Sequence, residues 1–351
     1  MAKPKEIPDL DCGAAAREGA RRVLLARFEE MCEYRDAALE GTDIEGVHDM
    51  RVASRRLRSA LRDFAPLLRR GKRLDAARAA LKRLADALGA VRDEDVAIHA
   101  LEKLAAQALP EARTGIEEYA AERRERRERA RVVLFEALDE QAVNEARQLL
   151  ARAVEGKAGK RVKRDEAPDF GAALGEVAGR LWRELAELSP SLHRPYKTGR
   201  LHDMRIAAKR LRYALELLHG CGRGGGAKEL ASEVADMQGE LGDLHDCDVW
   251  TKDLGGQLDA GLGSAERRRA SVWLLGHFAQ KRAGHYVAAL NLWHAWEAGD
   301  FRARLDACLA AAERPAPPPG VEDTAALEAA EASPPAAGGG QPQPAGALGD
   351  G

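Results

Sequence analysis

The chain has 351 residues, of which 45% are hydrophobic and only 5% aromatic, and its formal net charge is -2. This composition favours helices, because alanine, leucine, arginine and glutamate are good helix formers, whereas aromatic and β-branched residues favour strands. The near-neutral charge excludes a uniformly basic protein, so a site for anions must depend on where the basic residues lie.

Helical periodicity runs through most of the chain and predicts an all-α fold without strands. We expect a flexible N-terminus at 1–12, a first helical bundle at 13–154, a linker at 155–168, a second bundle at 169–312 and a disordered tail at 313–351. The first bundle is expected to contain helices near 13–40, 43–70, 72–90, 110–138 and 142–154. The second is expected to contain helices near 169–188, 199–219, 227–242, 265–298 and 300–312. Short connections favour antiparallel packing within each bundle.

Cysteines and hydropathy indicate the compartment. The cysteines Cys12, Cys32, Cys221, Cys247 and Cys308 form no CxxC pair and no metal-ligand spacing. They are therefore interpreted as incidental thiols in a reducing compartment. No apolar stretch has the length of a membrane span, and the first residues lack the apolar core of a signal peptide. A cytoplasmic protein without a membrane partner is expected.

An internal repeat is the most informative feature. The segment VHDMRVASRRLRSAL at 47–61 returns as LHDMRIAAKRLRYAL at 201–215, and ten of the fifteen positions are identical. A second pair follows in the same order, LGAVRDEDV at 88–96 and LGDLHDCDV at 241–249. The two offsets, 154 and 153, are nearly equal, so the sequence predicts duplication of one unit.

The first repeat places basic residues on one side of a helix. At about 100° per residue, His48, Arg51, Arg55, Arg58 and Arg62 lie within roughly 80° of one another, opposite an apolar stripe. The second copy repeats this basic stripe with His202, Arg205, Lys209 and Arg212, but Glu216 stands where Arg62 did. A solvated charged face would mix both signs at helical spacing, and no acid interrupts the first stripe. The pattern therefore predicts a surface that binds a polyanion.

Three further arginines lie on faces predicted to point inward. Arg123 and Arg127 share the line of the apolar residues of 110–138, and Arg282 does the same in the second unit. Burying an arginine without a partner is costly. The bundle either opens into a polar cavity here or brings these side chains to bound anions.

A metal site is not predicted. Asp93, Asp95, Asp246 and Asp248 have DxD spacing, but they follow the LG pair, where Gly89 indicates a helix end and carboxylates often cap the next helix. The pairs His48-Asp49 and His202-Asp203 lack the further ligands of a metal phosphohydrolase. We expect no metal and no cofactor.

The two HDMR segments and the two LG segments resemble those of the CHAD family, the conserved histidine α-helical domain. The resemblance covers roughly residues 13–312. It implies two four-helix bundles related by a pseudo-two-fold axis, with a basic surface or cavity between them. It also implies binding of inorganic polyphosphate, often at polyphosphate granules, through the basic stripes. Some members of the family carry a fused triphosphate-hydrolysing domain, whereas this chain is expected to be a standalone binder.

The sequence therefore predicts a polyphosphate-binding protein that is not an enzyme. Nucleic-acid binding is the first alternative, although aromatic residues do not alternate with the arginines as base-stacking platforms would. A phosphate-anhydride hydrolase, or an accessory to one, is the second alternative, although no nucleophile–base pair or phosphate-binding loop is present.

Overall fold

The computed structural model describes residues 4–41, 44–69, 71–155, 168–261 and 263–313. The first half contains α1 (Ala16–Glu33), α2 (Arg35–Glu40), α3 (Ile44–Asp63), α4 (Lys72–Ala105), α5 (Pro110–Ala137) and α6 (Glu140–Val154). The second contains α7 (Phe170–Leu188), α8 (Thr198–Gly220), α9 (Ala227–Asp259), α10 (Ala265–Ala298) and α11 (Phe301–Glu313). Two short 3-10 helices, Ala65–Leu67 and Ser189–His193, follow α3 and α7. The all-α prediction is confirmed, because the described residues contain no strand and only an isolated bridge between Ala15 and Asp169.

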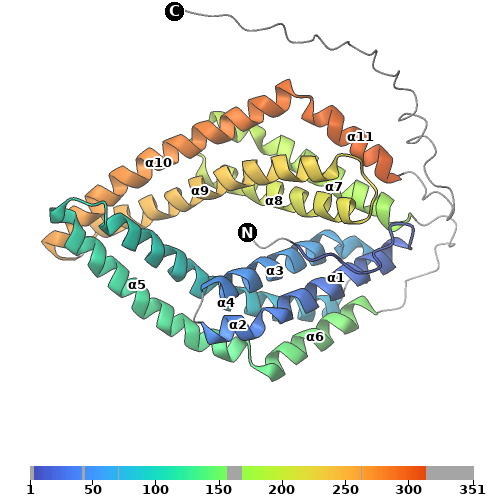
Figure 1. The fold of residues 1–351 in the computed structure, drawn as a ribbon, viewed down its shortest axis with the longest axis horizontal. Coiled ribbons are helices and arrows are strands. Elements are labelled where there is room, and N and C mark those ends of the chain that lie inside the picture. Colours follow the sequence, from blue (N-terminus) through green and yellow to red (C-terminus); the bar gives the residue numbers. More distant parts are fainter. Residues whose placement is uncertain (1–3, 42–43, 70, 156–167, 262, 314–351) are drawn as a thin grey trace, which may run out of the picture. The chain divides into compact units, whose positions relative to one another are not determined.

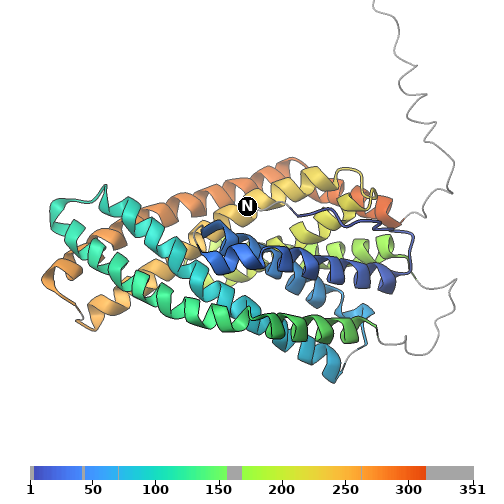
Figure 2. The same ribbon diagram turned by 60° about the horizontal axis from the view of Figure 1, so that its bottom comes forward.

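The helices form two sets that meet at both ends (Figure 1). In the first half, α3 packs on α1 and α4, and α4 packs on α5 and α6; in the second, α8 packs on α7 and α9, and α9 packs on α10. The sets touch through α1 with α7 and α3 with α8, and again through α5 with α10. Figure 2 shows the α5–α10 meeting from a second direction.

A continuous hydrophobic core joins the two sets. It includes Phe28, Met50 and Phe64 from the first half and Phe170 and Leu211 from the second, all at most 1% exposed. A second, smaller core fills the meeting of α4, α5, α9 and α10. The helices of the two predicted bundles therefore share one main core. Duplication of the unit remains a prediction from the sequence repeat.

The predicted helix breaks at the LG segments were wrong. Gly89 lies inside α4 and Gly242 inside α9, and both helices continue for more than a dozen residues beyond these glycines. Asp93, Asp95, Asp246 and Asp248 are therefore helix-interior residues and do not cap a following helix.

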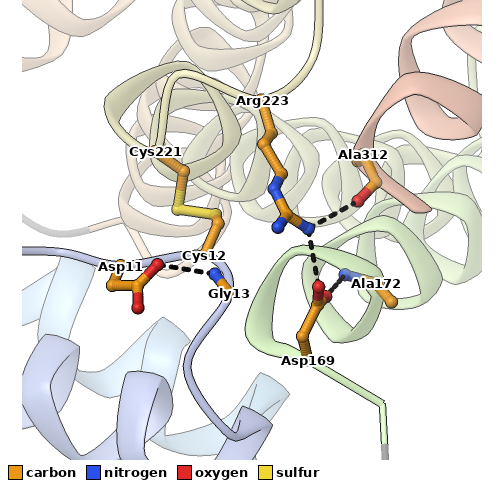
Figure 3. The surroundings of a disulfide bond; sticks show 8 residues. All are labelled: Asp11, Cys12, Gly13, Asp169, Ala172, Cys221, Arg223 and Ala312. Carbon is orange, nitrogen blue, oxygen red and sulfur yellow. Dashed lines mark hydrogen bonds and ion pairs between the residues drawn. A yellow bond between two sulfur atoms is a disulfide. The ribbon is translucent and has the colours of Figure 1, made fainter. Parts of the chain in front are cut away.

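The interpretation of all five cysteines as incidental thiols was also wrong. Cys12 and Cys221 form a disulfide with their Cα atoms 5.6 Å apart, which ties the segment before α1 to the residue that ends α8 (Figure 3). Around it, Arg223 pairs with Asp169, whose carboxylate also accepts a hydrogen bond from the backbone of Ala172 at the start of α7. Because disulfides persist mainly in oxidising compartments, this pairing weighs against the predicted reducing compartment.

Other predicted segments are only partly covered. Most of the linker at 155–168 and nearly all of the tail at 313–351 lie outside the described residues. Residues 4–12, predicted to be flexible, contact α1, where Arg27 donates to the Lys5 carbonyl over 2.8 Å. No helix among the described residues combines the length and apolar character needed to span a bilayer.

Candidate anion-binding site

The basic stripes belong to α3 and α8, which pack against each other. Their apolar faces are fixed in the core through Met50 and Leu57 on α3 and through Met204 and Leu211 on α8, all fully buried. Because the helical period places polar residues on the opposite side, burial of these four side chains turns the basic side chains away from the core.

The two stripes come together in what we call the central basic cluster, defined by Arg51, Arg55, Arg58, Arg205 and Lys209. Burial lowers the pKa of Lys209 to about 7, and the neighbouring positive charges add to this shift. In order of effect, these charges belong to Arg205, Arg55, Arg51 and Arg58. Cations from two helices thus lie close enough to repel one another.

Two acids, Asp93 and Asp246, lie close enough to interact with these charges. Arg51 donates to Asp93 over 3.0 Å at the exposed edge of the cluster. The Nε atoms of Arg55 and Arg205 are buried and have no hydrogen-bond partner among the described residues. Burial lowers the pKa of the Arg55 guanidinium, and the charges of Arg51 and Arg205 lower it further. Within the described residues, neither Arg55 nor Arg205 forms an ion pair with a carboxylate, so their positive charges are left for an anion to neutralise.

The two stripe histidines lie beside cations at the N-terminal ends of the stripes. Burial lowers the pKa of His48, and the charge of Arg92 lowers it further. Burial likewise lowers the pKa of His202. The neighbouring His245, whose ring centroid is 4.0 Å away, lowers it further. Both imidazoles are therefore mainly neutral near pH 7.

One group of possible metal ligands falls at the same place. Side-chain ligand atoms of Glu45, His48 and Asp49 lie within 4.8 Å of one another in the first turns of α3. The sequence spacing of His48 and Asp49 alone does not indicate this grouping. It is formed on one exposed helix turn, which is common without a bound ion.

Arg123, Arg127 and Arg282 have acidic partners within the fold. Arg127 Nε lies 2.5 Å from Asp95 Oδ1, and Arg282 Nε lies 2.5 Å from Asp248 Oδ1. Arg123 pairs with Glu94 and Asp253 and lies over the Trp250 ring. The cost of burying these arginines is thus met by carboxylates from α4 and α9.

The ends of the two stripes differ. Arg58 and Arg62 are exposed on α3, whereas Arg212, the counterpart of Arg58, is buried. Arg212 Nε lies 3.7 Å from Glu216 Oε1, and its guanidinium lies 5.0 Å from the Tyr213 ring centroid. The structure therefore brings Arg212 next to an acid and leaves Arg62 at the surface.

A comparison with protein families identifies the family to which the chain belongs. The CHAD domain model matches residues 22–255, about two thirds of the chain. The chain belongs to the CHAD family. A comparison with curated proteins found no match.

Solved structures share the CHAD fold. The crystal structure of the CHAD domain from the plant Ricinus communis is similar with a TM-score of 0.64 and 22% identity, covering 87% of this chain and 97% of that one. PptA from Streptomyces chartreusis is similar with a TM-score of 0.59 and 13% identity, covering 80% of this chain and 100% of that one. At these identities the likeness concerns the fold.

The sequence analysis did not predict that the repeat segments form ion pairs between the two halves. Arg56 and Arg210, which occupy the same repeat position, each reach an acid of the other half: Arg56 lies 3.6 Å from Glu216, and Arg210 donates to Asp63 over 3.1 Å. An arginine recurs at this position in both copies, outside the basic stripe, and this recurrence could have indicated a structural role.

The LG glycines lie beside the equivalent arginines of the two stripes. A Cβ built at Gly242 would lie 3.3 Å from Arg205 Nε, and one built at Gly89 would lie 3.7 Å from Arg51 Nε. The absence of a side chain at Gly242 therefore gives Arg205 room, whereas Gly89 could carry a Cβ in ordinary contact with Arg51. Their recurrence at offset 153 could have indicated a packing role.

Proposed function

We propose that this CHAD protein binds inorganic polyphosphate on the central basic cluster and does not alter it chemically. The observation that carries the proposal is the convergence of cations from α3 and α8 around Lys209, whose pKa is lowered to about 7 by burial and, in addition, by the charges of these neighbours. The CHAD family is linked to polyphosphate, and this link supports the same ligand class.

The chemistry of the ligand suits this cluster. Polyphosphate is a flexible chain of closely spaced negative charges, so it can follow side chains on two helices without recognition of a base or sugar. Guanidinium groups of Arg51, Arg55 and Arg205 can donate paired hydrogen bonds to phosphate oxygens. Binding relieves the repulsion among the cations, and the charge interaction makes affinity depend strongly on salt.

We propose that some of the basic residues bind the ligand and that others stabilise the fold. The residues that face the ligand are His48, Arg51, Arg55, Arg58, Arg62, His202, Arg205 and Lys209. Arg123, Arg127 and Arg282, each with a carboxylate partner, hold the α4–α5 and α9–α10 hairpins together. A cytoplasmic location and association with polyphosphate granules remain predictions.

The test is a salt titration of binding to long-chain polyphosphate. The variant Arg51→Ala/Arg55→Ala/Arg58→Ala is expected to lose most affinity and to reduce the dependence of log K on log salt by about 3, one for each lost phosphate contact. The matched control Arg124→Ala/Arg126→Ala/Arg129→Ala removes the same charge from exposed ion pairs of α5 and should bind normally. Retained binding in the first variant, with normal helicity, would refute the site.

Two competing functions give different results. A nucleic-acid-binding protein would release polyphosphate when excess RNA or DNA is added, and we expect little release. A hydrolase would produce inorganic phosphate from polyphosphate when magnesium or manganese is supplied. Such phosphate release, absent in the triple-alanine variant of the cluster, would replace the binding proposal with an enzymatic one.

A further inference from the structure

The second stripe ends at an acid. Glu216 occupies the repeat position of Arg62, and its carboxylate lies between two arginines. Oε1 lies 3.7 Å from Arg212 Nε on the same helix, and Oε2 lies 3.6 Å from Arg56 Nε on α3. One carboxylate therefore connects the end of the α8 stripe to the opposite half.

This triad is enclosed. The side chains of Arg56, Arg212 and Glu216 are 5%, 7% and 19% exposed. Both guanidinium groups also lie over the Tyr213 ring, with centroid distances of 5.6 and 5.0 Å. A cavity of about 20 Å³ beside Arg56 and Glu216 has room for about one water molecule, which is too little for a phosphate group.

The corresponding end of the α3 stripe is open. Arg58 and Arg62 are exposed, and neither forms an ion pair with any part of the chain that the structure describes. Arg58 belongs to the central basic cluster, and its charge helps to lower the pKa of Lys209. A chain of phosphates at the cluster therefore meets further free cations on the α3 side and a carboxylate on the α8 side.

We propose that Glu216 makes the polyphosphate site one-sided, which rests on the function proposed above. Glu216 holds Arg212 within the fold, so the bound polyanion leaves the central basic cluster over Arg58 and Arg62. Moving Arg212 to a phosphate would require it to leave an enclosed position beside Glu216 and the Tyr213 ring, where its side chain is only 7% exposed. The carboxylate of Glu216 also offsets one of the two positive charges at this end, which weakens its attraction for a phosphate.

Arg58 and Arg212 provide a matched pair for the test because they share a repeat position. With long-chain polyphosphate at low salt, Arg58→Gln and Arg62→Gln are each expected to weaken binding about fivefold to tenfold and to lower the salt slope by about 1. Arg212→Gln should change affinity less than about twofold and leave the slope unchanged. Equal losses in Arg58→Gln and Arg212→Gln would overturn the one-sided site.

Removal of the Glu216 carboxylate is expected to strengthen polyphosphate binding. In Glu216→Gln, Arg212 is released and the nearby negative charge is lost, so polyphosphate should bind about threefold to tenfold more tightly with a steeper salt slope. Glu233→Gln is the control, because Glu233 pairs with Arg304 on the outer side of the second half. Unchanged affinity in a folded Glu216→Gln protein would contradict the role of Glu216.

A labelling experiment separates this inference from the proposed function. Phenylglyoxal modifies accessible arginines, and peptide mass spectrometry reports each site without any ligand. Arg58 and Arg62 should react at least about tenfold faster than Arg212, and Glu216→Gln should raise the Arg212 rate. Equal rates in the native protein would refute the inference even if no polyphosphate bound, whereas failure of the unmodified protein to bind polyphosphate would refute the function alone.

Discussion

Arg210 on α8 contacts Asp63 on α3 through two guanidinium nitrogens, and both side chains are less than 10% exposed. The same guanidinium also donates to Glu184 on α7 over 2.8 Å. The contact between the two halves therefore contains a fully formed, buried ion pair. Breaking such a pair from one side leaves the other charge without compensation.

Replacing Arg210 should consequently destabilise the protein. We expect Arg210→Gln to lower the free energy of unfolding by about 3 kcal/mol, because Asp63 would stay buried with only the more distant and half-exposed Arg180 as a cation. Arg58→Gln, on the exposed side of the first copy of the repeat, should change it by no more than about 0.5 kcal/mol. Urea unfolding followed by circular dichroism gives both values, and similar values for the two variants would count against the ion pair.

Polyphosphate affinity should fall as pH rises through the pKa of Lys209, about 7. A bound polyanion favours the charged ammonium, so binding takes up protons and is tighter at pH 6 than at pH 8. Calorimetry in buffers of different ionisation enthalpy measures this uptake. Lys209→Arg keeps the charge at both pH values and should remove most of the difference between pH 7 and 8; His48 and His202, whose pKa values are lowered, contribute only at lower pH.

The same lysine gives stability an opposite dependence on pH. Between about pH 7 and the usual lysine pKa of about 10.4, the unfolded chain keeps a proton that the folded protein has lost. The unfolded state therefore binds more protons, and the contribution of Lys209 to stability rises with pH across this range. Lys209→Met should flatten the rise in denaturation curves recorded without ligand, and an unchanged slope would argue against the lowered pKa.

Gly242→Ala should affect binding more than stability. Alanine in a helix interior is favoured over glycine by up to about 1 kcal/mol, but the new methyl would lie 3.3 Å from Arg205 Nε and force the guanidinium to move. We expect polyphosphate affinity to fall several-fold while thermal stability is maintained. Gly89→Ala, with an ordinary 3.7 Å contact to Arg51, is the control, and it should bind nearly normally.

Arg127 and Arg282 should show the reverse behaviour. Each has a carboxylate partner, Asp95 and Asp248, that is more than four-fifths buried. Arg127→Gln and Arg282→Gln are expected to lower stability by about 1–3 kcal/mol, after discounting for the partial exposure of the arginines, with less than about a twofold loss of polyphosphate affinity. A large loss of affinity without destabilisation would return these residues to the ligand site.

Reduction of the Cys12–Cys221 disulfide should lower stability without changing the anion site. The bond closes a loop with a sequence separation of 209 residues, and native disulfides commonly contribute about 2–5 kcal/mol. Cys12→Ser/Cys221→Ser should therefore unfold at lower temperature than the oxidised protein and no longer respond to a reductant. Cys32→Ser, which leaves the bond intact, should retain that response.

The sequence predicted the helical fold and the α3 and α8 stripes because both depend on local periodicity. The HDMR segments fixed which faces are apolar, and Met50 and Met204 are indeed buried. The lengths of α4 and α9 were missed because Gly89 and Gly242 were read as breaks. In the structure both glycines lie inside long helices that pack beside arginines of other helices, and no local pattern reveals these tertiary contacts.

Contacts between distant segments account for the remaining differences. The periodicity of α5 and α10 placed Arg127 and Arg282 inward, but it could not show that Asp95 and Asp248 would meet them. The Cys12–Cys221 pairing likewise joins residues 209 apart in sequence, and cysteine spacing alone does not determine connectivity. Tertiary structure supplies these partners.

The disulfide also makes the covalent topology of the chain partly circular. Everything from α1 to the end of α8 lies inside the ring closed by Cys12 and Cys221. A single protease cut within that ring opens it without releasing a fragment, so the two pieces would migrate together on a non-reducing gel and separate only after a reductant is added. A molecule nicked between its halves would thus remain one covalent particle, with α3 and α8 still tethered to each other.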